Sequence, residues 1–242
     1  MCQRSTLDCE SFESALKSVA KIYRTTTSDI LTFLSSLNLA HYPELQPIFE
    51  SRFGPAQPLD SVCWFHLTRV PPGTKFSEGI LPLDRALDRI WTALTSILDV
   101  EKKLRLEQLR KEGVPNEMYA MKTAGRDHLG PHAMLVREIA FHADRIGNHD
   151  YLELPEIVEH ICYGYERRFG DNIREEVAKG LQKCTVKVEL PADSPDDSVE
   201  EALLYCWCKV QNQELSLASN ACFDGRGAPI SPDAIRKVEF IE

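Results

Sequence analysis

The segment 63–83 constrains the fold most strongly, because an apolar run and a rigid break lie close together in it. The run Val62–Phe65 is typical of a buried strand, and the polar residues of His66–Arg69 follow where that strand should leave the core. Pro71–Gly73 cannot continue a strand. We therefore expect a buried strand that ends in polar side chains and is followed by a loop.

Two kinds of periodicity divide the rest of the chain. Apolar residues at helical spacing predict helices within 1–58 and an amphipathic helix over 83–99, and a charged helix should follow up to Glu112. From Lys183 the pattern alternates, which is typical of strands, and 191–197 is predicted to be an acidic loop. The predicted strands after the first are 132–137, 184–190, 202–210, 215–223 and 235–241.

This order of elements predicts an α+β protein rather than a repeating βα fold. We expect an N-terminal helical cap over 1–58 and one α+β domain over 59–242.

Composition narrows the classes of protein that the chain can belong to. Hydrophobic residues make up 43%, and no apolar stretch approaches the length of about 18 residues that a spanning helix needs. The first residues are not followed by an apolar core of a signal peptide, so we expect a cytoplasmic protein. The formal charge of -9 does not favour nucleic acid as a partner, although a local basic patch stays possible.

The end of the first strand is the first candidate for chemistry. In a strand, His66 and Thr68 share one face with Leu67 opposite, so an imidazole and a hydroxyl could together contact a ribose or an amide. Arg69, at the strand exit, could pair with a phosphate through its planar guanidinium. The alternative is an ordinary strand end, with the histidine bonded to backbone and the arginine in solvent.

These residues resemble a known family. The sequences WFHLTR at 64–69 and PPGTKFSEGILPLDRAL at 71–87 resemble the first strand and following loop of the ADP-ribosyltransferase-like superfamily. The segment 228–239 is similar to the tail that commonly ends such domains, and the resemblance covers about residues 60–242. It implies a split, mostly antiparallel sheet with packed helices, and an N-terminal helical segment added to it.

The resemblance also implies a ligand, NAD, which such enzymes use as a substrate. His66 would hydrogen-bond the nicotinamide-side ribose, Thr68 would support it, and Arg69 would approach the pyrophosphate. Gly79, in the Phe-x-x-Gly-Ile-x-Pro element, is assigned to cofactor binding on the same ground. The implied activity is the transfer of ADP-ribose from NAD to a macromolecular acceptor.

That reaction needs a carboxylate near the 2′-hydroxyl of the ribose. The Glu-x-Glu and Gln-x-Glu pairs of arginine-modifying members are missing, so Glu214 is the first choice and Glu239 the second, with an ordinary surface carboxylate as the alternative for each. The nicotinamide could stack on an aromatic ring that the sequence does not single out. The candidates are Tyr119, Tyr151, Tyr163 and Tyr165.

Two alternatives stay open for the activity. A sister branch of the superfamily removes an RNA 2′-phosphate, and a histidine with arginines could do so here. The candidates are His66, Arg69, Arg137 and Arg226. The other alternative is a noncatalytic interaction protein, toxin-related or defence-related, with a degenerate pocket.

Histidines and cysteines are the remaining candidates. The histidines cluster in the middle of the chain without the HExxH spacing of a zinc helix, so no metal is expected. They are His128, His132, His142, His149 and His160. The eight cysteines form no Cys-x-x-Cys pair, and Cys206 and Cys208 are expected to be reduced and buried on one strand.

Overall fold

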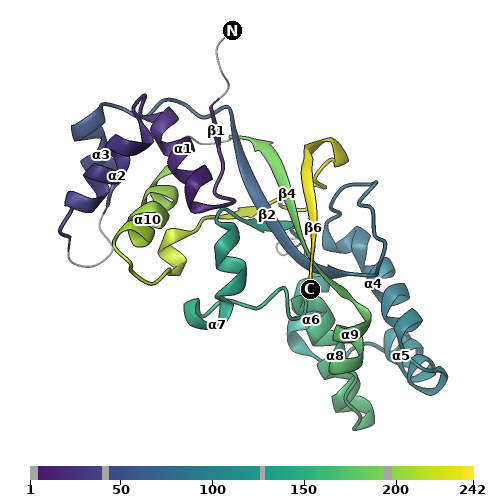
Figure 1. Cartoon of the computed structure of the whole chain (residues 1–242). Helices are drawn as coiled ribbons and strands as arrows, with labels where there is room; N and C mark the ends of the chain where they lie inside the picture. Colours follow the sequence, from purple (N-terminus) through teal and green to yellow (C-terminus); the bar gives the residue numbers. More distant parts are fainter. Residues whose placement is uncertain (1–4, 40–43, 126–128, 193–197) are drawn as a thin grey trace. The chain divides into compact units, whose positions relative to one another are not determined.

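The computed structural model of the chain describes residues 5–39, 44–125, 129–192 and 198–242, and it is an α+β protein as expected (Figure 1). The chain divides into two compact units, each built from three separate segments. Unit 1 comprises Met1–His66, Ala133–Asn148 and Lys187–Phe223, and unit 2 comprises Leu67–His132, His149–Val186 and Asp224–Glu242. These units differ from the predicted division at residue 58, which stays a prediction.

Four of the helices of unit 1 pack together, and α10 contacts each of the other three (Figure 1). Their bounds are Phe12–Ile22 for α1, Thr27–Ser36 for α2, Gln46–Phe53 for α3 and Val199–Val210 for α10. The first two begin at capping boxes, formed by Ser11 with Ser14 and by Thr26 with Asp29. The N-terminal helices predicted from the sequence are therefore present.

The prediction of a strand over 202–210 was wrong, because these residues belong to α10. A short run that is apolar on every side fits a buried strand and a buried helix equally well. Ala202 to Cys208 are all buried, so the alternation expected of a half-exposed strand could not decide between the two. Glu200 and Glu201 in the first turn favour a helix, since carboxylates there interact well with the helix dipole.

Glu200 also links α10 to the start of α3. Its two carboxylate oxygens accept hydrogen bonds from the backbone N–H groups of Leu45 and Gln46, at 2.7 and 2.6 Å. The N-cap residue of α3, Leu45, makes no side-chain hydrogen bond that caps this helix. A residue 155 positions along the chain thus supplies the acceptor that the first turn of α3 needs.

The described helices of unit 2 have a hydrophobic core of their own. The amphipathic helix expected over 83–99 is α4, and the charged helix that follows it is α5. The helices of this unit are α4 at Leu83–Ile97, α5 at Val100–Glu112, α6 at Glu117–Ala124, α8 at Glu156–Phe169 and α9 at Arg174–Gly180. The core between them includes the fully buried Leu94, Leu106 and Tyr165.

Six strands in the described residues form one sheet, in the order β5-β3-β2-β4-β6 with β1 paired to β2. Their bounds are Thr6–Leu7 for β1, Ser61–Val70 for β2, His132–Met134 for β3, Gln182–Pro191 for β4, Cys222–Asp224 for β5 and Ile235–Ile241 for β6. β1 runs parallel to β2 with Thr6 opposite Ser61, and β3 runs antiparallel with Met134 opposite Phe65. The sheet has both pairing directions.

The predicted strands were correct at three places and too long at two. β2, β4 and β6 lie where the sequence predicts them. Of 132–137 only the first three residues are a strand. Val136 forms an isolated parallel bridge with Cys9, and Arg137 begins the 3₁₀ turn Arg137–Phe141, which α7, Ala143–Ile146, follows. Of 215–223 only the end is extended, after the 3₁₀ turn Leu217–Ser219. Most of the predicted acidic loop, 193–197, lies outside the described residues.

The loop after β2 closes on a short backbone bridge. Ile80 and Ile230 exchange both of their backbone hydrogen bonds, at 3.0 and 2.9 Å. Gly79 lies directly against this bridge with φ +78°, and a Cβ on it would lie 1.9 Å from the Ile230 carbonyl oxygen. Only glycine meets both the left-handed conformation and the close approach.

We expect Gly79→Ala to lower the free energy of unfolding by about 3 kcal/mol, because both a left-handed backbone and a backbone clash oppose a Cβ. Guanidinium denaturation of the full chain measures this. Gly73→Ala is the matched control, since Gly73 has φ +81° but nothing within 4 Å of its Cβ position. It should cost about 1 kcal/mol. Equal losses in the two variants would contradict the role given to the Ile230 carbonyl.

Candidate functional site

The end of β2 carries the polar pair that the sequence singles out. Residues Ser61–Phe65 and Leu67 are buried, whereas His66 and Thr68 are half-buried. Their alternation puts both side chains on one face of the strand, as expected. The Thr68 hydroxyl makes a long contact, 3.4 Å, to the carbonyl oxygen of Arg69. The boundary between the two units falls directly after His66.

Arg69 leaves β2 on the opposite face from Thr68, because neighbouring strand residues alternate. Its side chain is 8% exposed and contacts other residues of unit 2. Nε donates to the carbonyl oxygen of Leu152 at 2.6 Å, and Nη1 donates to those of Ala178 and Leu181. Three of the guanidinium N–H groups therefore connect β2 to the segments around α8 and α9.

The third nitrogen of this guanidinium, Nη2, lies 3.7 Å from a carboxylate oxygen of Glu153, which is beyond hydrogen-bond distance. Burial lowers the pKa of Arg69, while the charges of Glu153 and Asp150 act in the opposite direction. Arg69 stays a cation under any ordinary condition. Its observed contacts support the fold, and the sequence could not show them because all three carbonyls come from distant segments.

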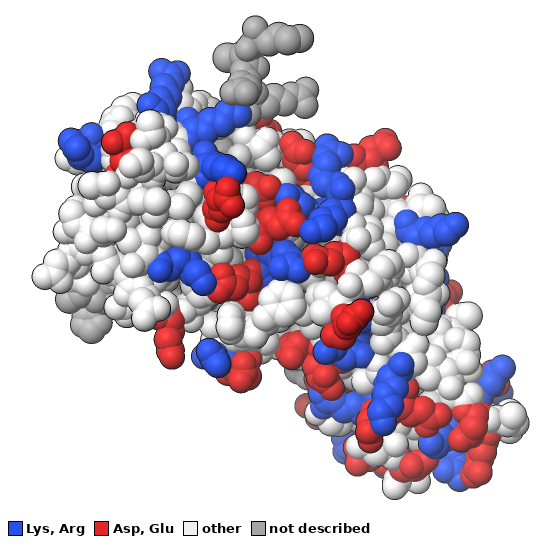
Figure 2. Space-filling model, in the orientation of Figure 1, with Lys and Arg blue, Asp and Glu red and all other residues white. Residues whose placement is uncertain are grey.

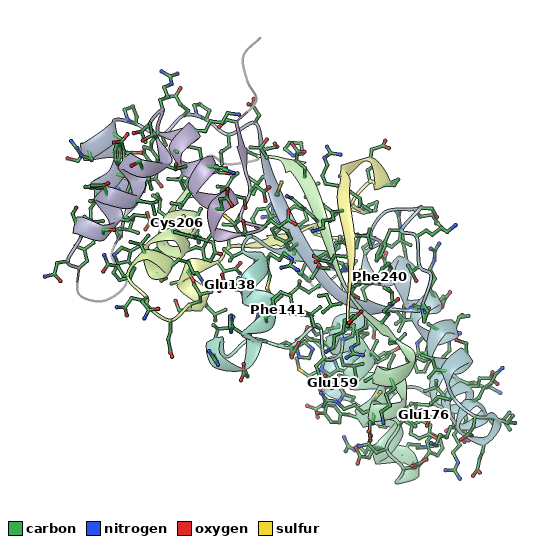
Figure 3. All side chains as sticks on the ribbon, in the orientation of Figure 1. Glu138, Phe141, Glu159, Glu176, Cys206 and Phe240 are labelled. Atoms are coloured by element: carbon green, nitrogen blue, oxygen red, sulfur yellow. The ribbon has the colours of Figure 1, made fainter. Side chains whose placement is uncertain are left out.

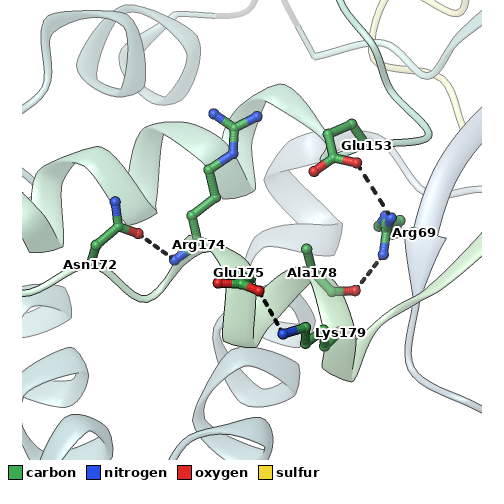
Figure 4. A pocket seen from close by; sticks show the side chains of 7 residues that line it. All are labelled: Arg69, Glu153, Asn172, Arg174, Glu175, Ala178 and Lys179. Atoms are coloured by element: carbon green, nitrogen blue, oxygen red, sulfur yellow. Dashed lines mark hydrogen bonds and ion pairs between the residues drawn. The ribbon is translucent and has the colours of Figure 1, made fainter.

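A pocket of about 480 Å³ opens beside Arg69 within unit 2 (Figure 4). Its charged wall combines Arg69 and Glu153 with three residues of α9, namely Arg174, Glu175 and Lys179. The volume falls within the range of small-molecule sites. No sequence pattern predicts this pocket beyond the position of Arg69.

Gly79, expected to bind a cofactor, has a structural explanation as described above: it lets the loop close on Ile230. The two candidate carboxylates lie in different units. Glu214 is exposed in the turn after α10, not after a strand. Glu239, on β6, accepts a hydrogen bond from Thr185 at 3.5 Å and lies 3.6 Å from Lys237.

The four tyrosines considered for stacking have different surroundings. Tyr165 is fully buried in the core of unit 2, and Tyr119 packs edge-on against Trp91. Tyr151 contacts the ring of His149, with ring centroids 4.8 Å apart. Tyr163 is 45% exposed, and the guanidinium of Arg174 lies over its ring. Tyr165 is therefore not open to a ligand.

The histidines form no common centre. Within the described ranges, no group of three or more histidine, cysteine or acidic side chains is arranged to hold a metal ion. His132, His142 and His149 each face a different carboxylate, those of Asp224, Glu138 and Glu159. Burial lowers the pKa of His160, and the nearby Lys122 adds to this effect. His128 lies outside the described residues.

Two half-buried charge clusters in unit 1 were missed by sequence reasoning. Lys187, 13% exposed, donates to Asp8 at 2.6 Å and to Glu10 at 2.8 Å. Glu138 accepts from Tyr205 at 2.8 Å and from Lys209 at 2.7 Å (Figure 3).

Burial alone would raise the pKa of Glu138, but the hydrogen bonds from Lys209 and Tyr205 lower it below its ordinary value. Each cluster joins a strand or helix to a distant segment of unit 1, so we assign both to the fold.

Cys206 and Cys208 are buried as expected, but on the helix α10, where Figure 3 labels Cys206. Residues two apart on a helix point in different directions, so the two thiols do not share a face. Burial raises the pKa of Cys208 to about 11 and that of Cys184 to about 11. Such thiols stay protonated near neutral pH and react slowly.

The chain was compared with protein-family models, with curated proteins and with solved structures, and no match was found in any of the three comparisons. Every helix in the described ranges is too short or too polar to cross a bilayer.

We expect Arg69→Met to lower the free energy of unfolding by about 3 kcal/mol, because three buried carbonyl groups lose their donor. Arg89→Met is the matched control. Arg89 is 59% exposed and pairs with Glu78 in water, so its loss should cost less than about 1 kcal/mol. Denaturant unfolding of both variants tests the difference. A similar small effect for both would show that the carbonyl contacts of Arg69 add little stability.

Native alkylation should modify Cys222 much faster than the other cysteines that the structure describes, because it is the exposed one among them. Burial raises the pKa of the Cys222 thiol as well as those of Cys162, Cys184 and Cys206, so access to the reagent and not the thiolate fraction sets the order. Mass spectrometry after iodoacetamide treatment in a Cys2→Ser background measures this order. Rapid native labelling of Cys184 or Cys206 would contradict the packing described here.

Proposed function

We propose that the chain binds NAD and transfers ADP-ribose from it to a macromolecular acceptor. The observation that carries the proposal is the pair His66 and Thr68, half-buried on one face at the end of an otherwise buried strand. An imidazole and a hydroxyl in this arrangement can hydrogen-bond neighbouring hydroxyls of a ribose. The resemblance of the surrounding sequence gives that ribose its identity as the nicotinamide side of NAD.

In this proposal the protein orients the ribose of NAD and places a negative charge near it. Fixing the ribose lets the bond to nicotinamide break through an oxocarbenium-like state, and a carboxylate near the 2′-hydroxyl stabilises the developing positive charge. Glu214 and Glu239 are the proposed carboxylates, in that order. The pyrophosphate contact expected of Arg69 stays a prediction outside this proposal, since Arg69 leaves β2 on the opposite face from His66 and Thr68 and two of its nitrogens donate to backbone carbonyls.

The charge distribution bears on the acceptor. Figure 2 shows basic and acidic side chains intermixed on the face that it displays, without a region of basic residues alone. With a formal charge of -9, this favours a protein over a nucleic acid as the acceptor. A cytoplasmic location is part of the same proposal.

We expect NAD to raise the melting temperature of the full chain, because a ligand that binds only the folded state stabilises it. His66→Ala should weaken NAD binding by about tenfold, which corresponds to one lost hydrogen bond. His132→Ala is a control, since His132 is a half-exposed histidine outside β2. No thermal shift and no hydrolysis with millimolar NAD would refute the proposal.

The two carboxylates are separated by comparing Glu214→Gln with Glu239→Gln. The residue that acts near the ribose should lose about a hundredfold in turnover while NAD affinity stays nearly unchanged. If NAD binds but neither variant loses turnover, the carboxylate assignment fails and the binding proposal survives.

A further inference from the structure

The pocket beside Arg69 has one deep cation that the protein leaves incompletely paired. The Arg69 side chain is 92% removed from solvent, and the three groups that accept its hydrogen bonds are neutral backbone carbonyls. Carbonyl dipoles satisfy the N–H groups but do not cancel a full positive charge. Buried charges are normally matched by an opposite charge.

The carboxylate nearest to this guanidinium is a weak partner. Glu153 lies 3.7 Å from Nη2 and its side chain is 51% exposed, so the pair is neither hydrogen-bonded nor shielded from water. Asp150 also acts on Arg69 electrostatically. Its carboxylate accepts hydrogen bonds from the backbone N–H groups of Leu152 and Glu153. The two N–H groups of Nη2 make no hydrogen bond to any residue that the structure describes.

The rest of the pocket wall is neutral in formal charge, so Arg69 is its excess cation. Arg174 and Lys179 contribute two positive charges, and Glu153 and Glu175 contribute two negative ones. Arg174 forms an ion pair with Glu159, with 2.6 Å between Nη1 and Oε1. Lys179 pairs with Glu175 within α9 while both are more than 70% exposed, so it can turn toward a ligand at little cost.

The geometry points to this pocket as a binding site for the phosphate group of a small phosphorylated molecule. Nη2 would donate both of its N–H groups to phosphate oxygens, and Lys179 would add a mobile positive charge at the rim. The volume of about 480 Å³ leaves room for an organic group attached to the phosphate. The site goes beyond the proposed function, because Arg69 and the pair His66 and Thr68 leave β2 on opposite faces.

Isothermal titration calorimetry tests the site with inorganic phosphate and with glycerol phosphate, at constant ionic strength. Both should bind saturably to the full chain, and glycerol phosphate should bind at least as tightly. Arg69 itself is not the variant of choice, since it also supports the fold. The test instead uses two substitutions at the rim of the pocket, one that removes a negative charge and one that removes a positive charge.

Glu153→Gln should tighten phosphate binding by about two- to fivefold, because it removes a competing negative charge, and Lys179→Gln should weaken it by about the same factor. Lys17→Gln is the matched control. Lys17 forms the same kind of exposed pair, with Glu13 four residues before it at 2.6 Å, in unit 1. Phosphate affinity should not change in this variant.

Absence of saturable binding by both phosphate compounds would overturn the inference, and so would equal affinities in Glu153→Gln, Lys179→Gln and Lys17→Gln. His66→Ala should bind phosphate like the unmodified chain. Loss of NAD binding in that variant with phosphate binding intact separates the two sites. Phosphate binding that fails while NAD still binds would overturn this inference alone.

Discussion

The backbone pairing of β2 is the constraint on which both units depend. This strand of ten residues lies in the middle of the sheet order and supplies residues to each unit. An interior strand must satisfy its N–H and C=O groups with neighbours on both sides, and its side chains must suit what covers each face. Buried residues therefore fill its first half, and polar residues begin only where the strand leaves that environment.

Much of the fold could be predicted wherever a local pattern was unambiguous. The amphipathic stripe of α4 and the alternation in β4 identify those elements without tertiary information. The helix α10 was predicted as a strand because Leu203 to Cys208 are apolar throughout, so neither the helical nor the strand periodicity is visible in them. The length of β3 was predicted wrongly because the strand ends at Met134, inside an apolar run that continues to Val136, and such ends depend on what packs nearby.

The candidate site was predictable in part for a different reason. The shared face of His66 and Thr68 follows from alternation alone, and the same rule assigns Arg69 to the other face. The carbonyl groups of Leu152, Ala178 and Leu181 around Arg69 belong to segments more than 80 residues away, and nothing in their sequence marks them as acceptors. Contacts of this kind become visible only in three dimensions.

The carboxylate of Glu200 at the start of α3 has a consequence for how the protein is made. Unit 1 joins residues from the beginning of the chain to residues near position 200, so its N-terminal helices are translated long before α10 exists. During synthesis α3 lacks that cap, and the apolar faces of α1 and α2 lack the helix that covers them. Unit 1 therefore cannot be completed during synthesis until the ribosome has released its last segment, Lys187–Phe223.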